Sequence, residues 1–590
     1  MILPQLTTLE TSGLIRLAQT QPEVEYLFRH ALVQEAAYDS LLKNSRRQLH
    51  RSVGEVLERL YPDRLASRDL APLLGWHFLE AGDERRALKY FTLAGDAAAR
   101  VYANTEAVMH YTQALSLIRG VDSERETLIH LYLSYGHALE LSAQDAAAVA
   151  NYEALETVAR ARGDRALELD ALLAQAIVYL KPVSVRDPAK GQALSERALA
   201  LARELNNRAA EAKSLWNLMQ FFKWSDQMVE AQAWGEQALA IAREFNLREL
   251  TAYSLHDLSS VYLVNGQFEP AMTAMLEAQQ LWRELGILNM LADNLASYAE
   301  LHVMTGQYDR AIALSREALQ ISQTIGNLWN QSYSWYMIDL AYLDRGEIGS
   351  AIEVAEECLR LAQQAGFVPG VLQSVLDLTL IYGYLGAVHL GYEVAERSRG
   401  WAQGMPMAGL LESVMIARLH LFSGRLADAQ AVFGEAQRGI DARSLSAYLS
   451  WFTGLVEGEL ALAAGDYARV LSLTDEAIPF LRQARIRLFF PDVLYTRGKA
   501  LLGLARTDEA HAAFQEARVE AEAIGSRRSL WSILAALSEI EARRGNQAEA
   551  QQLRWQARDI VEFIAEHVGS PELRTSFLNL PDVRDVLRET

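Results

Sequence analysis

The stretch NGQFEPA at residues 265–271 decides the fold, because its pattern returns at a fixed interval. TGQYDRA follows at 305–311, RGEIGSA at 345–351 and SGRLADA at 423–429. Each phrase has glycine second and a small residue last. Glycine closes one helix in the left-handed conformation at little cost, and a small residue early in the next helix lets the two helices approach closely. The interval of about 40 residues therefore predicts a repeated helical hairpin.

Three ladders of small residues keep this register along the chain. The turn ladder comprises Gly266, Gly306, Gly346, Gly386, Gly424, Gly465, Ala505 and Gly545. The ladder within the second helix comprises Ala198, Ala238, Ala278, Ala318, Cys358, Ser398, Ala436, Ala477, Ala517 and Ala557. The ladder at hairpin ends comprises Asn206, Asn246, Gly286, Gly326 and Gly366. Since Cys358 stands where alanine stands elsewhere, we expect it to be a buried packing residue and not a reactive or metal-binding thiol.

The pattern resembles the tetratricopeptide repeat, through the Gly-x-aromatic-x-x-Ala turn from Gly266 to Ala271 and the preceding Tyr262. The resemblance extends over roughly residues 82–565. It implies an all-α fold, a right-handed α-α superhelix or solenoid with repeats of about 40 residues. Such arrays serve many functions, so the fold alone names no ligand.

Composition narrows the class of function. The net charge of −19 argues against a broad nucleic-acid or anionic-membrane surface, and Cys358 is the only cysteine, so no disulfide can form within the chain. The start of the chain has no signal-peptide pattern, and no apolar run has the ~20 residues that span a bilayer. We expect a cytoplasmic protein with no membrane partner, for which nucleic acid is an unlikely partner.

The first 80 residues do not carry the repeat. Their pattern predicts a helix from Leu3 to Gln19, an extended run at Glu25–Phe28, a helix in ALVQEAAYDSLL (31–42), and a basic helix for which Asn44 or Ser45 supplies the N-cap.

Three phrases from the two ends of the chain resemble STAND signal-transduction ATPases. EYLFRHALVQEAAYDSLLKNSRRQLHRSVGEVLE (25–58) is similar to the end of the winged-helix domain of that family. GWHFLEAGDERRALKYFTLAGDAAARVYANTEAVMHYTQAL (75–115) is similar to the junction that follows, and ARDIVEFIAEHVGSPELRTSFLNLPDVRDVLRE (557–589) to the end of such chains. We therefore expect a partial winged-helix-like segment at 1–60, a helical connector at 61–105, a superhelix of about 11–12 hairpins at 106–568 and a capping segment at 569–590.

The departure from that family is as informative as the match. No GxxxxGK[ST] occurs in the sequence, so the phosphate-binding loop is missing. The resemblance then implies a sensor region whose ATPase domain lies upstream, with ATP or ADP and Mg expected only in that domain. In this chain we expect no cofactor, no metal and no catalytic residue, since no HExxH, GxSxG or His/Cys ligand cluster appears.

The same resemblance assigns residues to the interface with the nucleotide domain. His30 matches a position from which a winged-helix histidine approaches the phosphates of the bound nucleotide, although an ordinary fold-stabilising role is open as well. Arg46 and Arg47 belong to a basic helix start with His50 and Arg51. This start is typical of a solvated face or of a domain interface.

In a tetratricopeptide superhelix the first helix of each hairpin lines the concave surface. Counting back from the turn residues predicts a groove for a ligand or partner, rich in aromatic and charged side chains. Its residues are Lys213, Trp216, Gln220, Lys223, Trp224, Tyr253, His256, Ser260, Asp293, Glu300, Tyr333, Tyr336 and Asp344. Arg418, His420, Tyr495 and Lys499 stand at similar positions in the second half. The aromatic residues could instead fill hairpin cores, because an error of one residue turns a side chain by ~100°.

Two hypotheses of function follow. The favoured one is the sensor and autoinhibitory region of a STAND-type ATPase, in which an inducer, a small molecule or a protein, shifts the equilibrium between closed and open states. The alternative is a passive scaffold that docks peptide or helical segments. A DNA-binding regulator and an enzyme rank lower.

Overall fold

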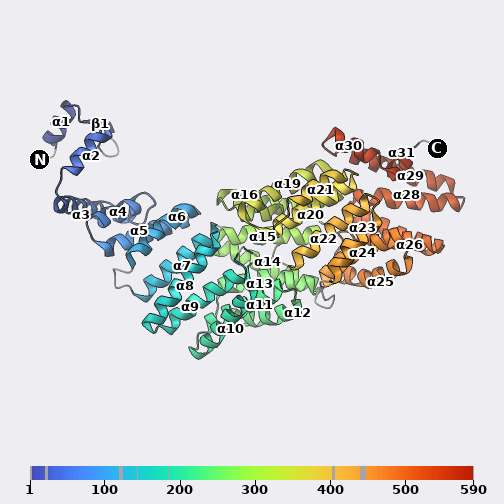
Figure 1. Cartoon of the computed structure of the whole chain (residues 1–590), viewed down its shortest axis with the longest axis horizontal. Helices are drawn as coiled ribbons and strands as arrows, with labels where there is room; N and C mark the ends of the chain where they lie inside the picture. The colour runs from blue at the N-terminus through green and yellow to red at the C-terminus, as the bar shows by residue number, and fades with distance from the viewer. Residues whose placement is uncertain are drawn as a thin grey trace. The chain divides into compact units, whose positions relative to one another are not determined.

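The computed structural model describes residues 3–19, 24–118, 124–142, 144–181, 183, 185–401, 406–438 and 447–588. The chain forms two compact units, residues 1–142 and residues 143–590. In both units consecutive helices pack against each other along the chain (Figure 1). The all-α repeat fold expected from the ladders is confirmed.

The first unit begins with a small strand pair. Strands β1 and β2 pair in antiparallel fashion, with Ile15 opposite Phe28. The unit consists of α1 (Leu3–Thr11), β1 (Ile15–Gln19), β2 (Glu25–Phe28), α2 (Ala31–Asp39), α3 (Lys43–Leu60), the 3-10 turn η1 (Pro62–Arg64), α4 (Leu70–Glu80), α5 (Glu84–Ala99), α6 (Asn104–Ile118) and α7 (Arg125–Leu141).

The strand expected at Glu25–Phe28 is confirmed, but two local predictions for this unit are wrong. The helix predicted from Leu3 to Gln19 ends at Thr11, because Gly13 takes a left-handed φ of +74° and the chain then pairs with β2. The helix predicted to start at Asn44 or Ser45 begins at Lys43, and the side chain of its cap residue, Leu42, makes no capping hydrogen bond.

The second unit is the hairpin array. The first helices of its hairpins are α9 (Arg165–Leu180), α11 (Arg208–Trp224), α13 (Arg248–Val264), α15 (Leu288–Met304), the interrupted pair α17 (Leu328–Trp335) and α18 (Ile338–Asp344), α20 (Val368–Tyr384), α22 (Pro406–Phe422), α24 (Ala447–Ala464), α26 (Phe490–Gly503) and α28 (Arg527–Arg543). The second helices are α10 (Pro188–Glu204), α12 (Met228–Glu244), α14 (Phe268–Leu285), α16 (Tyr308–Thr324), α19 (Ile348–Ala365), α21 (Val388–Glu396), α23 (Leu426–Arg438), α25 (Tyr467–Gln483), α27 (Thr507–Ile524) and α29 (Gln547–Glu566). Helix α8 (Asp145–Arg162) precedes this array, and α30 (Pro571–Leu578) and α31 (Pro581–Leu587) follow it.

The small residues of the ladder within the second helices are buried, as the sequence predicts. Ala238, Ala278 and Ala318 are fully buried, and Cys358 is buried at the equivalent place in α19. Burial raises the pKa of the Cys358 thiol to about 12. The thiol is therefore neutral at physiological pH and packs as a small apolar group.

One first helix is broken where its neighbours run on. Helix α17 ends at Trp335, and α18 begins at Ile338 after Met337 adopts a left-handed φ of +60°. A non-glycine residue in this region carries backbone strain. Just beyond the break, Asp339 faces Asp377 of α20; we call these two residues the buried carboxyl pair. Each leaves its Oδ2 without a hydrogen-bond partner, and burial raises the pKa of Asp339 to about 7.

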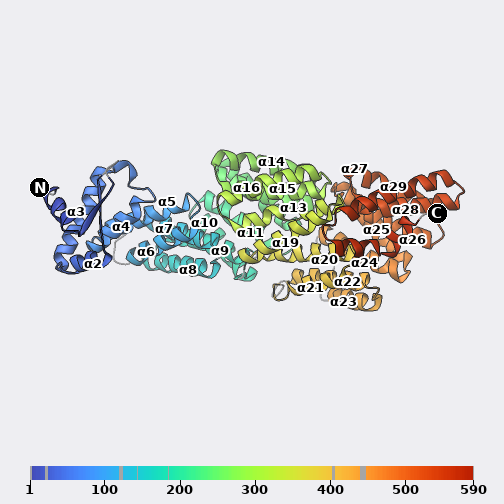
Figure 2. The ribbon, with the colours of Figure 1, turned by 90° about the horizontal axis from the view of Figure 1, so that it is seen from above.

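In the second unit, the turns of hairpins α15–α16 and α18–α19 pack against α27 and α29; we call this contact the fold-back seam. In Figure 2 the green hairpins that include α15 and α16 lie next to the red helix α27. A Cβ at Gly306 would collide with Ile524, and a Cβ at Gly346 would lie 2.9 Å from Ile564 Cγ1. In both pairs the partner stands about 218 positions further along, which is about 5.5 hairpins. Successive superhelical turns therefore touch.

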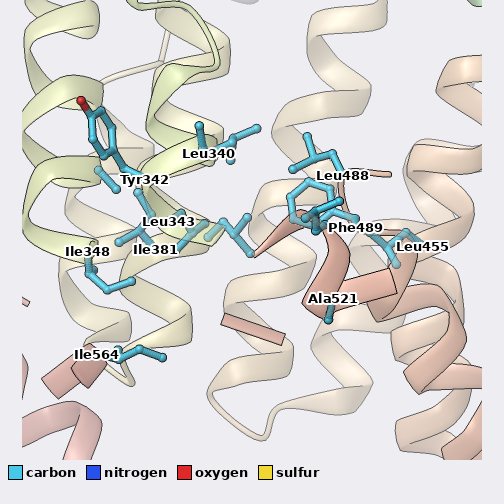
Figure 3. Close-up of a cluster of buried hydrophobic side chains, with 14 of the residues drawn as sticks. Leu340, Tyr342, Leu343, Ile348, Ile381, Leu455, Leu488, Phe489, Ala521 and Ile564 are labelled. Atoms are coloured by element: carbon cyan, nitrogen blue, oxygen red, sulfur yellow. The ribbon is translucent and has the colours of Figure 1, made fainter. Parts of the chain in front are cut away.

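Backbone hydrogen bonds and a shared core hold the seam together. The amide of Arg487 donates to the carbonyl of Met304 at 2.8 Å, and the amide of Gly349 donates to the carbonyl of His567 at 2.7 Å. Figure 3 shows buried apolar side chains of the core that is shared across the seam. Leu340 and Leu343 come from α18 and Ile381 from α20, and they meet Leu455 of α24, Leu488 and Phe489 just before α26, Ala521 of α27 and Ile564 of α29.

A buried ion network closes the seam. Arg528 of α28, 8% exposed, contacts Asp344 Oδ1 of α18 through its Nε at 2.6 Å. Its Nη1 and Nη2 donate to the two oxygens of Asp492, both at 2.7 Å. Asp344 also accepts a hydrogen bond from the hydroxyl of Tyr308 at 2.5 Å. The two carboxylates and the arginine satisfy one another in the interior.

Candidate functional site

Ionisable side chains from four consecutive first helices meet in one continuous group. Its members come from α11, α13, α15 and α17, the first helices of four successive hairpins. We call it the first-helix row. It comprises Lys223, His256, Asp257, Asp293, Glu300 and Tyr333.

The row begins with a compensated carboxylate. Lys223 Nζ lies 2.8 Å from Asp257 Oδ1, and Trp216 Nε1 donates to Asp257 Oδ2 at 2.9 Å. Burial alone would raise the pKa of Asp257, but Lys223 and the neighbouring His256 hold it below its ordinary value. Asp257 is therefore charged and paired.

The middle of the row is less well compensated. His256 Nε2 lies 3.4 Å from Asp293 Oδ2, and Asp293 faces no arginine or lysine in an ion pair within the described residues. Burial raises the pKa of Asp293 and outweighs the attraction of His256, while the charge of Asp257 raises it further. Asp293 keeps 16% of its side chain exposed, so solvent still reaches it.

The row ends at a carboxyl beside a tyrosine. The hydroxyl of Tyr333 donates to Glu300 Oε2 at 3.4 Å and shares a hydrogen bond of 2.9 Å with Ser297 Oγ. Burial raises the pKa of Glu300 to about 7, against the lowering effects of Tyr333 and Lys223. Glu300 is thus divided between its neutral and charged forms near neutral pH.

Aromatic rings flank the row at both ends. The ring centroids of Trp216 and Tyr253 lie 5.5 Å apart, and those of Tyr333 and Tyr336 also lie 5.5 Å apart. The ammonium of Lys213 stands 3.8 Å from the Trp216 centroid and 5.1 Å from that of Tyr253. Trp216 is buried in the hairpin core, and Tyr253, Tyr333 and Tyr336 pack against the core. The core interpretation of the aromatic residues therefore has support, and ligand binding by them stays a prediction.

The remaining predicted groove residues are placed as follows. Gln220 is buried, Trp224 is exposed, and Ser260 is half-buried with its hydroxyl donating to the carbonyl of Asp257. Asp344 lies apart from the row, in the seam network with Arg528.

The four second-half positions form no common group in the structure. Arg418 pairs with Glu459 at 2.6 Å, and His420 Nδ1 lies 2.8 Å from the hydroxyl of Tyr392. Tyr495 packs on Phe514, and Lys499 is exposed.

Sequence reasoning missed Asp257, although it is the residue that Lys223 and Trp216 both bind. The signal was present. Asp257 follows Tyr253 by four positions and precedes Ser260 by three, so the three share one face of α13. The buried carboxyl pair was missed too, because nothing in the 40-residue spacing marks the helix break that places Asp339.

The first unit contains the predicted interface residues and also many exposed apolar side chains. His30 is exposed, Arg46 pairs with Asp39 at 3.3 Å, and Arg47 is exposed. Most exposed large apolar side chains of the described residues stand in the first 110 positions. On α3 they are Leu49, Val53, Val56 and Leu60, spaced four, three and four apart, and Leu32 and Leu42 are each 78% exposed.

The described ranges contain neither a metal-binding cluster nor a membrane-spanning helix. No group of three or more His, Cys, Asp or Glu side chains there could hold a metal ion. None of the helices in the same ranges is both long and apolar enough to cross a membrane.

Comparison with known proteins finds similarity to solved structures only. No protein-family model matches the sequence, and no curated protein does. Among solved structures, the chain is similar to a signal transduction ATPase with numerous domains and a tetratricopeptide repeat sensor from Pyrococcus horikoshii, at 15% identity and TM-score 0.42, over 71% of this chain and 60% of that one. It is also similar to aspartyl phosphate phosphatase F of Bacillus subtilis (14%, TM-score 0.35, 74% and 94%) and to the APC/C hetero-tetramer Cut9–Hcn1 (13%, TM-score 0.45, 87% and 97%). The chain therefore spans less than two thirds of the Pyrococcus chain.

Proposed function

We propose that this chain is the sensing and regulatory repeat region of a STAND-type signal-transduction ATPase. In this proposal an inducer binds the first-helix row, and the first unit carries the effect to a nucleotide-binding domain outside this sequence. The chain itself is not an enzyme and works in the cytoplasm. The inducer can act only if it binds the two states of the protein with different affinity.

The first-helix row supports the binding half of this proposal. It joins four hairpins into one group of half-buried carboxyl, imidazole, ammonium and phenol groups that solvent still reaches. Buried ionisable groups with perturbed pKa values are costly for a fold, and they gather where a protein binds or reacts. Since the row lacks the geometry of a metal site or of a nucleophile with its base, binding is the function that it supports best.

The apolar surface of the first unit supports the regulatory half, and it is the observation that favours a sensor over a passive scaffold. Four apolar residues of α3 at helical spacing, together with Leu32 and Leu42, remain uncovered. Exposed apolar surface of this kind marks a contact with another protein surface. A scaffold that binds only through its solenoid has no need of it. The phrase at 25–58 resembles the STAND winged helix in the same segment.

The nucleotide sequence upstream of the Met1 codon tests the proposal directly. We expect the reading frame to continue upstream and to encode GxxxxGK[ST]. A frame that starts at Met1 would refute the sensor function and favour the scaffold.

If the P-loop domain is found, its binding to this chain can be measured by analytical ultracentrifugation. Leu42→Asp and Leu60→Asp should abolish binding, because each places a charge in the apolar surface. Leu504→Asp is the matched control, since Leu504 is an exposed leucine of the solenoid. Equal binding by all three variants would exclude α3 as the docking face.

A further inference from the structure

The chemistry of the first-helix row narrows the kind of inducer, an inference that rests on the proposed function. We propose that the row binds an organic dication, a ligand with two ammonium or guanidinium groups about 10 Å apart, one at Asp293 and one at Glu300. The two groups can belong to a free polyamine or to basic side chains of a peptide.

The first argument for a dication is the balance of charge in the first-helix row. Lys223 pairs directly with Asp257 at 2.8 Å and attracts Asp293 and Glu300 only without direct contact. The direct neighbours are His256 for Asp293 and the neutral hydroxyl of Tyr333 for Glu300. Two carboxyl groups thus lack a full positive partner, in a protein region where burial penalises their charged forms. A ligand that supplies two positive charges removes this penalty.

The spacing of the two carboxyl groups carries the second step. Asp293, Ser297 and Glu300 stand at positions i, i+4 and i+7 of α15, so they lie along one face of the helix. Seven residues of helix rise about 10 Å. The two terminal ammonium groups of extended spermidine, which also carries a central third one, match this separation, and so do two basic side chains of a short peptide.

The neighbouring aromatic rings carry the third step, because they already hold a cation of this type. The ammonium of Lys213 lies over the rings of Trp216 and Tyr253 at 3.8 and 5.1 Å from their centroids. At the other end of the row, the rings of Tyr333 and Tyr336 form a second aromatic pair beside Glu300. Ammonium and guanidinium groups are attracted to such ring faces.

A buried amide adds an acceptor without a donor. Asn294 is fully buried, and its Nδ2 lies 2.9 Å from Met275 Sδ and 3.3 Å from His256 Nδ1, so the amide stands between the hairpin core and the row. Its Oδ1 has no hydrogen-bond partner. An acceptor left open at this place is what a site for an N–H-bearing ligand contains.

Binding of a cation should also release protons. Glu300 has a pKa near 7, and the charged groups that face it or its neighbours across the row are Lys223, His256, Asp257 and Asp293. Because a cation favours the ionised carboxyl, its affinity should increase as the pH rises from 6 to 8. The reverse holds for an anion.

Isothermal titration calorimetry on the full chain tests the inference, with spermidine, its diacetylated form and a short peptide carrying two arginines as probes. The double variant Asp293→Asn with Glu300→Gln should bind at least about 30-fold more weakly than the parent. Asp508→Asn is the matched control, because it removes an exposed carboxylate far along the chain that pairs with Arg544. Circular dichroism confirms that each variant is folded.

Each outcome has a definite meaning. Spermidine binding that is lost in the double variant and kept in the control supports a free polyamine. Binding of the diarginine peptide alone supports a basic polypeptide as the source of the same groups. Binding that is absent for both probes, equal in the double variant, or retained by diacetylated spermidine overturns the inference. None of these results depends on the upstream reading frame, so failure here is distinct from failure of the proposed sensor function.

Discussion

Replacing Arg528 by alanine should open the fold-back seam. Arg528 is 8% exposed and makes three charge-assisted hydrogen bonds, one to Asp344 and two to Asp492. Without it, Asp344, which is 1% exposed, keeps only the hydroxyl of Tyr308, and an uncompensated charge stays buried. Breaking one side of a buried ion network costs about 3–5 kcal/mol. We expect a loss of this size in the free energy of unfolding of the seam.

The loss should be local, because a repeat array unfolds hairpin by hairpin and not as one unit. Hydrogen exchange read by mass spectrometry should show faster exchange in α18, α26 and α28, and unchanged exchange in α9 to α12. Urea unfolding followed by far-UV circular dichroism should acquire an earlier transition.

Two further variants make the result interpretable. Arg506→Ala removes an exposed arginine that pairs with Glu509 at the surface, so it should leave both measurements unchanged. Arg528→Met combined with Asp344→Asn removes the buried charges on both sides and should recover much of the loss. Exchange rates in α18 that stay at the parent level in Arg528→Ala would refute the argument that this network closes the seam.

Three other changes test separate parts of the fold. Asp339→Asn should stabilise the protein above pH 7 and not below pH 4. In the folded protein the pKa of Asp339 is raised from 3.8 to about 7, so the stability that its neutral carboxyl contributes is fully present at low pH and is lost as the pH rises through 7. Urea unfolding at pH 8 should therefore show a gain of up to about 4 kcal/mol in the free energy of unfolding of the variant. Gly306→Ala should lower the free energy of unfolding by about 1–3 kcal/mol more than Gly286→Ala does. Both glycines have a φ near +70°, but only a Cβ at position 306 would collide with a neighbour, Ile524. Equal melting temperatures for the two variants would contradict the seam contact. Cys358 should react with a thiol reagent only on unfolding, since burial keeps the thiol neutral and covered; fast reaction in the native state would contradict its packing role.

The repeat could be predicted from the sequence because its constraints are local. A left-handed turn and a close helix crossing each restrict one position to small residues, and they do so again 40 residues later. Gly266, Ala278 and Cys358 all stand where this reasoning places them. The strand at Glu25–Phe28 was likewise within reach of local pattern, whereas β1 was not. The order of apolar and polar residues in β1 is compatible with a helix, and only its pairing with β2 makes it a strand.

What could not be predicted depends on contacts between distant residues. Asp344 has the spacing of a groove residue, but its partner Arg528 stands 184 positions away. No period in the sequence connects them. The break at Met337 is hidden for a related reason: Gly346 keeps its place in the turn ladder, so the spacing shows an ordinary hairpin while the helix inside it is interrupted. All six members of the first-helix row could be found from helical spacing, and the sequence predicted five of them, all but Asp257.

The fold-back seam also explains why the turn ladder is most regular where it is. Asp226 and Ala505 take the left-handed conformation at φ of +60° and +59°, so that conformation alone does not demand glycine in this fold. At Gly306 and Gly346 a second requirement applies, because the turn packs against the following superhelical turn and leaves no room for a Cβ. The same contacts hold the hairpins that carry α15 and α17. The carboxyl groups of the first-helix row keep their raised pKa values only while the helices stay closely packed. A looser array would admit water, which would lower the cost of their charged forms. The seam is therefore what keeps the row ready for a cation.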